Sequence, residues 1–434
     1  MFVEFDPLAV FWFIVAGIVT LRIAKHAFGS YAAPVGIYGS LWCFSLAFFY
    51  LGISQFYTLR IETILVFGGT TLLFILGAIV AKGQGRGKAM SQFMKTEKLP
   101  GSAQLHLLVY ALFGLGIVGV LTYYWRLNEI IGIESLWLDP VRVRFEESAG
   151  ELSRIGWINA ARSFLIPCFV LAVMYLSLLN HKSRRLMWIA AVMSFLLLVP
   201  SSGRTTIMTM VVWAILARVY LPVSSAQKIS TKRYAVWFLV ISSLCVVYFL
   251  ATTNLLGKAV DSEAGMADIA HYTSSSFPAF QVMVRAPEMF AQHTSLTFGM
   301  VSRILNEIDP SSFSYPDYVQ ATVDVPGSTN TYTYLDAFFL DFGWLGVFLF
   351  PFVLGLLTTR LYLSMRRSPS VIKVYVASLF GLCIVESTGV NRFGNFSTWL
   401  WILGTIAVAS LITRFARQRS GVRSFSRRIS ADAL

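Results

Sequence analysis

About eleven long apolar stretches, separated by charged connections, constrain this chain more than any other feature of its sequence. A helix needs roughly 20 apolar residues to cross the hydrocarbon core of a bilayer. Of the 434 residues, 56% are hydrophobic and only 13% are charged, whereas soluble domains carry about 25% charged residues. The sequence therefore predicts an all-α polytopic integral membrane protein, with residues 1–434 forming a single membrane domain. The predicted spans are 7–21, 35–53, 61–81, 105–124, 157–179, 186–200, 205–220, 234–252, 342–363, 371–388 and 395–413.

The charged residues separate according to the side on which the connections between spans lie. Of the 35 Lys and Arg residues, 24 fall in one set of alternate connections, and 20 of the 22 Asp and Glu residues fall in the other set. Positive charge marks the cytoplasmic side of a membrane protein. With an odd number of spans, we expect the N-terminus outside the cytoplasm and the basic tail, residues 414–434, inside it. This topology and contact with anionic lipid explain the basic excess, so we expect no nucleic acid partner.

Two connections on the acidic, outer side are long enough to carry a site. The first covers residues 125–156, and the second, between the eighth and ninth spans, covers residues 253–341. Connections of such length are usually functional or separately folded. In the second connection, residues 279–285 and 297–305 mix apolar and polar residues in the pattern of short amphipathic helices that lie at a membrane interface.

Two short motifs resemble nucleotide-binding sites but occur in the wrong context. Gly114, Gly116 and Gly119 match the GxGxxG pattern, which needs a strand before it and a helix after it to bind a dinucleotide. Inside an apolar span, small residues instead allow a second helix to come close, and we expect that role here. Asp341-Phe342-Gly343 matches the kinase triplet without the other kinase motifs. The histidines and cysteines show no metal-ligand spacing, so the sequence indicates no metal and no cofactor.

Arginines on the outer side are the sharpest candidates for chemistry, because the positive-inside rule does not explain them. A guanidinium binds phosphate oxygens in a bidentate manner and keeps its charge at working pH. At membrane depth such a charge needs a partner or a wet cavity. Alternatively, each arginine is a paired or snorkelling residue at the membrane rim. The candidates are Arg204, between two short spans that could also form one broken or re-entrant pair, Arg285 and Arg303 in the second outer loop, and Arg392 in the last outer turn.

Carboxylates near the end of the second outer loop are candidates for assisting a nucleophile. Glu307 follows Arg303 by four residues, so on a helix the two would share a face. They would form either a plain ion pair or a general base and the group that places it. Asp336 and Asp341 precede the ninth span, where Asp341 could alternatively cap the first turn of the helix.

The segment Gly327–Tyr334, Gly-Ser-Thr-Asn-Thr-Tyr-Thr-Tyr, is rich in hydroxyl, amide and aromatic groups. Hydroxyls and amides can hydrogen-bond to sugar hydroxyls, and aromatic rings can stack on the apolar face of a sugar. Asn330, Tyr332 and Tyr334 are therefore candidate sugar-binding residues. An aromatic belt followed by a turn would have the same composition.

Three of these segments resemble the Wzy-type O-antigen polymerases, the oligosaccharide repeat-unit polymerases. One is Asn330-Thr331-Tyr332-Thr333, followed by Asp336 and by Leu340-Asp341-Phe342-Gly343-Trp344-Leu345-Gly346. The others are Ser202-Gly203-Arg204-Thr205 at the start of a span and Asn391-Arg392-Phe393-Gly394 near the C-terminus. The number of spans and the large outer loop in the C-terminal half are also similar, so the resemblance covers nearly the whole chain in architecture but only short motifs in sequence.

The resemblance implies a GT-C-like, metal-independent glycosyltransferase in the bacterial inner membrane, with a periplasmic N-terminus and a cytoplasmic C-terminus. It would join oligosaccharide repeat units carried on undecaprenyl diphosphate at the periplasmic face, with a chain-length-regulating co-polymerase as a further partner. The alternatives are a ligase that uses the same donor, and a transporter, which would carry ionisable residues at the bilayer midplane. The implied substrate-binding residues are Arg204, Arg392, Arg303, Arg285, Asn330, Tyr332, Tyr334 and Asn391, and the implied catalytic carboxylates are Glu307, Asp336 and Asp341.

Overall fold

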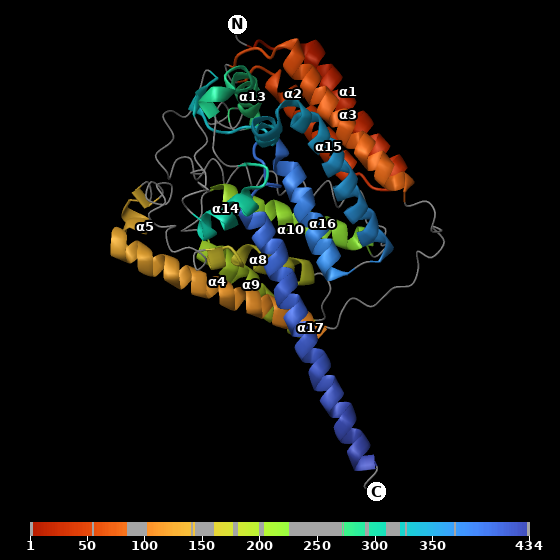
Figure 1. The fold of residues 1–434 in the computed structure, drawn as a ribbon, viewed down its shortest axis with the longest axis vertical. Helices are drawn as coiled ribbons and strands as arrows, with labels where there is room; N and C mark the ends of the chain where they lie inside the picture. The colour runs from red at the N-terminus through yellow and green to blue at the C-terminus, as the bar shows by residue number, and fades with distance from the viewer. Residues whose placement is uncertain are drawn as a thin grey trace. The chain divides into compact units, whose positions relative to one another are not determined.

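The structure, a computed structural model, is helical in nearly all of its regular parts (Figure 1). Among the described residues, the strands are β1 (Val323–Asp324) and β2 (Ser328–Thr329), which pair antiparallel with Val323 opposite Thr329. The structure describes residues 3–53, 56–84, 102–139, 142–143, 160–176, 181–198, 204–224, 271, 273–290, 295–309, 322–325, 328–368 and 370–431.

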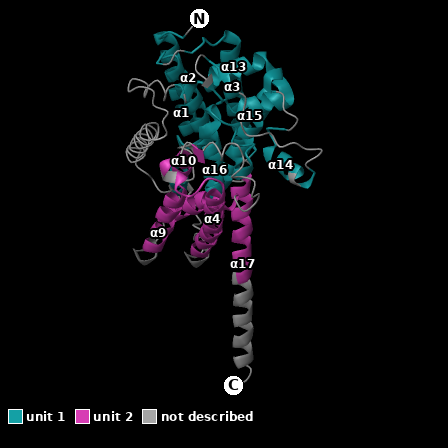
Figure 2. Ribbon diagram, turned by 90° about the vertical axis from the view of Figure 1, so that its left-hand side faces the viewer, with its two compact units in different colours: residues 1–97, 215–369, 373–398 teal, residues 98–214, 370–372, 399–434 magenta. Residues whose placement is uncertain are grey.

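The chain divides into two compact units, which Figure 2 shows in different colours. Unit 1 contains residues 1–97, 215–369 and 373–398, and unit 2 contains residues 98–214, 370–372 and 399–434.

Helices correspond to ten of the eleven predicted spans. Six helices are long and apolar enough to cross a bilayer, and four shorter apolar helices account for the others within the described residues. The predicted span 234–252 lies outside the described residues. The prediction of an all-helical, polytopic membrane protein is therefore confirmed, while the number of spans stays a prediction. The ten helices are α1 (Pro7–Phe28), α2 (Pro34–Phe49), α3 (Ile61–Gly83), α4 (Ser102–Ile130), α8 (Leu165–Leu176), α9 (His181–Leu198), α10 (Arg204–Ser224), α15 (Leu335–Arg367), α16 (Val371–Val385) and α17 (Phe396–Ala431).

The two long loops that the sequence predicts to lie on the outer side contain helices of their own. In the first loop, α5 (Ser135–Leu138) is a single turn. In the second loop, α13 (Ser276–Arg285), the 3-10 turn η2 (Pro287–Phe290) and α14 (Gly299–Ile308) are described. Helices α13 and α14 overlap the two segments for which the sequence predicts amphipathic helices.

Local sequence signals set both ends of α1. The Asp6 carboxylate accepts hydrogen bonds from the backbone N–H groups of Leu8 and Ala9, both at 3.0 Å, and Pro7 occupies the first helical position. Proline fits there because its missing N–H would have no partner within the helix. Gly29 ends the helix with φ of 75°, a left-handed conformation that glycine adopts without steric cost.

Helices α3 and α15 pack against each other through glycine. A Cβ added at Gly77 would collide with the carbonyl oxygen of Phe352, and one added at Gly355 would collide with that of Phe74. The Gly69 position faces the Phe348 ring, so residue numbers rise together along both helices and the pair is parallel. Small residues permit this approach of two backbones, which is a common way for membrane helices to associate.

Contacts at both ends of the helices in unit 1 give their directions. At one end, the Val3 N–H donates to the Phe56 carbonyl, joining the start of the chain to the loop before α3. At the other end, the Arg366 guanidinium donates to the Phe28 carbonyl, and Lys82 lies 5.7 Å from the centre of the Phe28 ring. Helices α1, α3 and α15 therefore run in one direction, and their C-terminal ends meet.

The two ends of unit 1 differ in charge, as the sequence predicts. The end where α1, α3 and α15 finish carries Lys25, His26, Lys82, Arg360, Arg366, Arg367 and Lys373. The end where they begin carries Asp6, Glu62, Asp324, Asp336, Asp341 and Glu386. We call the second the acidic end. That it faces away from the cytoplasm stays a prediction.

In unit 2, the glycine motif of α4 serves helix packing, so this prediction is confirmed. A Cβ at Gly119 would collide with the backbone of Arg162, and one at Gly116 would collide with the Leu165 side chain. By contrast, Gly114 faces open space. The first glycine of the motif is therefore incidental, and the other two bring α4 against residues 162–165.

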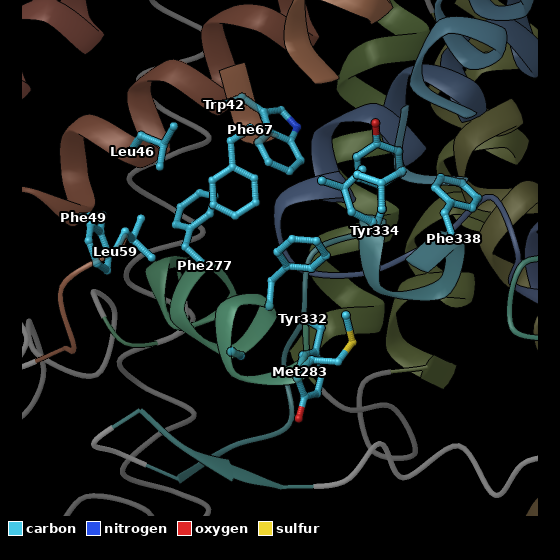
Figure 3. Close-up of a cluster of buried hydrophobic side chains, with 14 of the residues drawn as sticks. Trp42, Leu46, Phe49, Leu59, Phe67, Phe277, Met283, Tyr332, Tyr334 and Phe338 are labelled. Atoms are coloured by element: carbon cyan, nitrogen blue, oxygen red, sulfur yellow. The ribbon is translucent and has the colours of Figure 1, made fainter. Parts of the chain in front are cut away.

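An aromatic core joins helix α13 of the second outer loop to the spans α2 and α3. The ring of Phe277 lies 6.0 Å from Trp42 and 5.3 Å from Phe67, between centroids (Figure 3). The Tyr38 and Phe74 rings stack at 4.0 Å deeper between the two spans. Helix α13 is thus anchored by buried side chains within unit 1 and forms part of its core.

Candidate functional site

Three segments that are distant in the sequence meet at the acidic end of unit 1. We call them together the junction: residues 295–303, 329–341 and 386–396. The Tyr334 N–H donates to the Ser387 carbonyl at 2.8 Å, which joins the second segment to the third. A Cβ at Gly299 would lie 2.8 Å from the Gly394 carbonyl oxygen, so the first segment also touches the third.

Asp341 ties the first segment of the junction to α15. Its carboxylate accepts hydrogen bonds from the Ser295 hydroxyl at 2.8 Å and from the N–H groups of Leu296 and Thr297 at 3.2 and 2.7 Å. These donors belong to the segment before α14 and not to the first turn of a helix that follows Asp341. Because both carboxylate oxygens already accept hydrogen bonds, Asp341 is better suited to positioning this segment than to accepting a proton.

Gly343 breaks α15 two residues after Asp341. Its φ of 61° and ψ of −149° are non-helical and separate a short outer stub, residues 335–342, from the long helix 344–367. This region of backbone space is essentially open to glycine alone. The glycine of the kinase-like triplet therefore has a conformational role, which places Asp341 at the boundary between the stub and the span.

We expect the substitution Gly343→Ala to destabilise the protein by about 1–3 kcal/mol, because alanine is strained at this φ and ψ. Thermal unfolding of the purified protein in detergent would measure the loss. Gly114→Ala is a matched control, since a Cβ at Gly114 meets nothing within 4 Å. Equal stability of the two variants would contradict the assignment.

Arg392 forms an ion pair with Glu386 inside the junction. The Nε–H of Arg392 donates to Glu386 Oε2, and the two side chains are only 13% and 15% exposed. Glu386 begins η3 (Glu386–Thr388), the 3-10 turn that follows α16. A guanidinium is also a group that binds phosphate oxygens in a bidentate manner.

Sequence reasoning did not single out Glu386. The signal was nevertheless present, because an acidic residue stands six positions before Arg392, at the end of the predicted span 371–388. Charges of opposite sign this close in the sequence at membrane depth favour pairing.

The turn that carries Asn391 is packed closely against the first segment of the junction. The Asn391 side-chain oxygen accepts a hydrogen bond from the Gly394 N–H at 3.2 Å. A Cβ at Gly394 would collide with the Leu296 carbonyl oxygen. The amide nitrogen of Asn391 is buried and has no hydrogen-bond partner among the described residues, so it is an unsatisfied donor inside the junction.

Arg303 lies on α14 and stacks over Phe396, the first residue of α17. Its guanidinium carbon is 4.7 Å from the centre of the ring, within the range of a cation–π interaction. Arg303 and Arg392 therefore both belong to the junction. The Glu307 side chain lies outside the described residues, so the predicted relation between Arg303 and Glu307 stays open.

Tyr332 and Tyr334 are buried instead of lining an open surface. The Tyr334 hydroxyl is 2.8 Å from the Tyr38 hydroxyl, and the Tyr332 ring meets the Phe290 ring edge-on at 5.5 Å. Burial raises the pKa of both phenols far above 10, and for Tyr332 the negative charge of Asp336 adds to the effect. Both are neutral at working pH. With their ring faces covered by protein, they are placed to shape the junction and not to stack on a sugar.

The remaining candidates have different surroundings. Asn330 is exposed, Arg285 is exposed at the end of α13, and Asp336 is buried in the first turn of α15. Arg204 begins α10 in unit 2, and its side chain lies outside the described residues. Of the predicted residues, the junction therefore contains Arg303, Asn330, Tyr332, Tyr334, Asp336, Asp341, Asn391 and Arg392, whereas Arg204, Arg285 and Glu307 lie outside its bounds. No group of three or more His, Cys, Asp or Glu residues in the described parts of the chain is arranged to hold a metal ion.

Comparisons with known proteins add nothing to this geometry: no family model, no curated protein and no solved structure matches the chain.

Proposed function

We propose that this protein is a GT-C-like glycosyltransferase that polymerises oligosaccharide repeat units carried on undecaprenyl diphosphate. The observation that carries the proposal is the placement of Arg303 and Arg392 together in the junction, at the acidic end of unit 1. Membrane proteins concentrate arginine at the opposite, cytoplasmic side. Two guanidinium groups held at the acidic end, beside the start of α17 and the end of α16, suit an anionic ligand whose lipid tail lies in the bilayer.

The reaction assigns a task to the arginines, to Asn391 and to the carboxylates in or near the junction. The acceptor sugar hydroxyl attacks the anomeric carbon of the donor, the bond from that carbon to the diphosphate oxygen breaks, and the lipid diphosphate leaves. Arg392 and Arg303 neutralise the charge that develops on the leaving diphosphate. A carboxylate, for which Asp336 and Glu307 are the candidates, takes the proton of the attacking hydroxyl. The buried amide of Asn391 donates to a sugar or phosphate oxygen.

The same proposal gives the protein a location and partners. The acidic end faces the periplasm, the basic tail faces the cytoplasm, and the membrane is the bacterial inner membrane. The donor and acceptor are both lipid-linked oligosaccharides, and a co-polymerase sets the chain length. Arg204 and Arg285 belong to the proposal as further groups that bind phosphate.

The experiment that tests the proposal is a gel of surface glycolipid from a strain that lacks this gene, complemented with wild type or with Arg392→Gln. We expect wild type to restore the polymer ladder and Arg392→Gln to reduce polymerisation roughly 10²-fold or more, leaving a one-repeat band, because a stabilising donor to the leaving group is lost. The matched control is Arg360→Gln, an exposed arginine at the basic end of unit 1. Immunoblots would establish equal protein levels.

Other outcomes of the same gel have specific meanings. Polymer that accumulates on the lipid carrier without transfer to the surface glycolipid would identify a ligase. A ladder that does not depend on the gene would refute the polymerase proposal and make transport the next hypothesis.

A further inference from the structure

We propose that α14 lies in the membrane interface, with one face in contact with the acyl chains of the surrounding bilayer. The apolar residues of this face are Phe298, just before the helix, and Val301, Leu305 and Ile308. Their spacing of three, four and three residues places them in one stripe along a helix. Phe298 is 50% exposed, Val301 52% and Ile308 75%, and Leu305 is half-buried.

The opposite face of α14 is the one that contacts protein. Arg303, half a turn from the centre of the stripe, stacks over Phe396. Ser302 is buried, and its hydroxyl donates to the Ser295 carbonyl at 3.1 Å. The helix is thus held by its polar face and exposes its apolar face, which is the reverse of a helix that is immersed in water.

The apolar stripe of α14 is continuous with the surface of a membrane span. The Phe298 ring meets the Phe342 ring edge-on at 6.2 Å. Beyond Phe342, α15 exposes Trp344 and Leu345, and Leu345 is 71% exposed. Helix α15 is long and apolar enough to cross a bilayer, and side chains exposed on such a helix contact lipid. The exposed apolar surface of α15 therefore continues from Leu345 through Phe342 to Phe298 and the stripe on α14.

The tether at Asp341 sets the depth of α14. Asp341 stands two residues before the break at Gly343, where the long helix begins, and it binds the backbone of Leu296 and Thr297. The first turn of α14 is therefore fixed at the level where α15 enters the apolar layer. Figure 2 shows α14 at the edge of unit 1. An amphipathic helix at that level buries its apolar face among the outer acyl chains.

This placement has a consequence for Arg303. Contact of the apolar face of α14 with lipid favours the orientation of the helix in which Arg303, on the opposite face, points toward Phe396 and the Asn391 turn. The bilayer is then one of the elements that hold the guanidinium in place, independently of which substrate the junction binds.

Spin labels would test the proposal directly. The full chain, with its four cysteines replaced by alanine, is reconstituted in nanodiscs of phosphatidylethanolamine and phosphatidylglycerol. Single cysteines at Val301 or Ile308 carry the label, Leu345→Cys is the lipid reference, and Asn330→Cys, at an exposed polar position, is the water reference. Collision rates with oxygen, which partitions into lipid, and with a water-soluble nickel chelate are measured by power saturation.

We expect labels at Val301 and Ile308 to collide with oxygen in preference to nickel, as the Leu345 label does. Preference for nickel, as at Asn330, would overturn the proposal, because the stripe would then face water. Shielding from both reagents would also overturn it and would mean that protein, such as a second copy of the chain, covers the stripe. If the cysteine-free chain does not fold, a photo-activatable benzophenone residue at position 301 of the natural sequence replaces the label. An adduct with phospholipid supports the proposal, and an adduct with protein refutes it.

Discussion

Alanine at position 77 is expected to prevent α3 and α15 from packing as they do in the native protein. The added Cβ collides with the Phe352 carbonyl oxygen, which belongs to a helix backbone and cannot rotate away as a side chain can. The two helices must separate along their parallel contact, and the close backbone contact at Gly355 is lost with it. We expect a destabilisation of about 3 kcal/mol or more, at the upper end of the range for overpacking.

The measurement is the yield and thermal unfolding of the Gly77→Ala variant in detergent. Gly68→Ala is the matched control on the same helix, because a Cβ at Gly68 meets nothing within 4 Å. The control is expected to be as stable as wild type or slightly more stable, since alanine favours a helix over glycine. If both variants unfold at the same temperature, α3 and α15 do not pack through Gly77.

Alanine at position 341 is expected to release α14 from α15. The substitution removes the acceptor of three hydrogen bonds, two of them from backbone N–H groups. Each hydrogen bond to a charged group contributes about 1.5–3 kcal/mol to stability. Because Asp341 is only half-buried, water can replace part of these hydrogen bonds in the variant. We therefore expect the free energy of unfolding to fall by about 2–4 kcal/mol. Arg303 belongs to the released helix, and the Asn391 turn packs against the segment before it, so under the proposed function polymerisation should fall together with stability.

Hydrogen exchange followed by mass spectrometry would locate this effect. Peptides that cover residues 295–309 should exchange faster in Asp341→Ala, with an intermediate effect in Asp341→Asn, which keeps one acceptor oxygen. Asp324→Ala is the control, because Asp324 is exposed on β1 in the same unit. Unchanged protection of residues 295–309 in Asp341→Ala would show that the carboxylate does not hold α14.

The sequence predicts the architecture well because membrane insertion depends on composition over about 20 residues, and composition is directly readable. The separation of acidic and basic residues between the two ends of unit 1 was also predictable, because the positions of the spans determine on which side each connection lies. The role of Gly116 and Gly119 was also predictable, since a glycine motif inside a span can do little else than pack. Which of the three glycines face a neighbour could not be predicted, because that depends on the rotation of α4.

The site was harder to read from the sequence. Tyr332 and Tyr334 have the composition of a sugar site, but the structure buries both. Burial depends on contacts with α2 and η2, which lie far away in the sequence. Glu386 was missed as the partner of Arg392, although it stands only six positions before it. Asp341 was considered as a base or as a cap of its own helix, and its true partners, Ser295 to Thr297, are 44 to 46 residues away.

The break at Gly343 also determines how a mechanical load passes through α15. A continuous helix would transmit a pull on its outer end along its hydrogen-bonded backbone to the basic end of the bundle. The break at Gly343 interrupts that path, and the stub instead rests against the long helix, where the Phe338 ring stacks on the Phe350 ring at 4.4 Å. A pull on the stub would therefore be borne first by this ring contact and by the hydrogen bonds from the segment before α14 to Asp341.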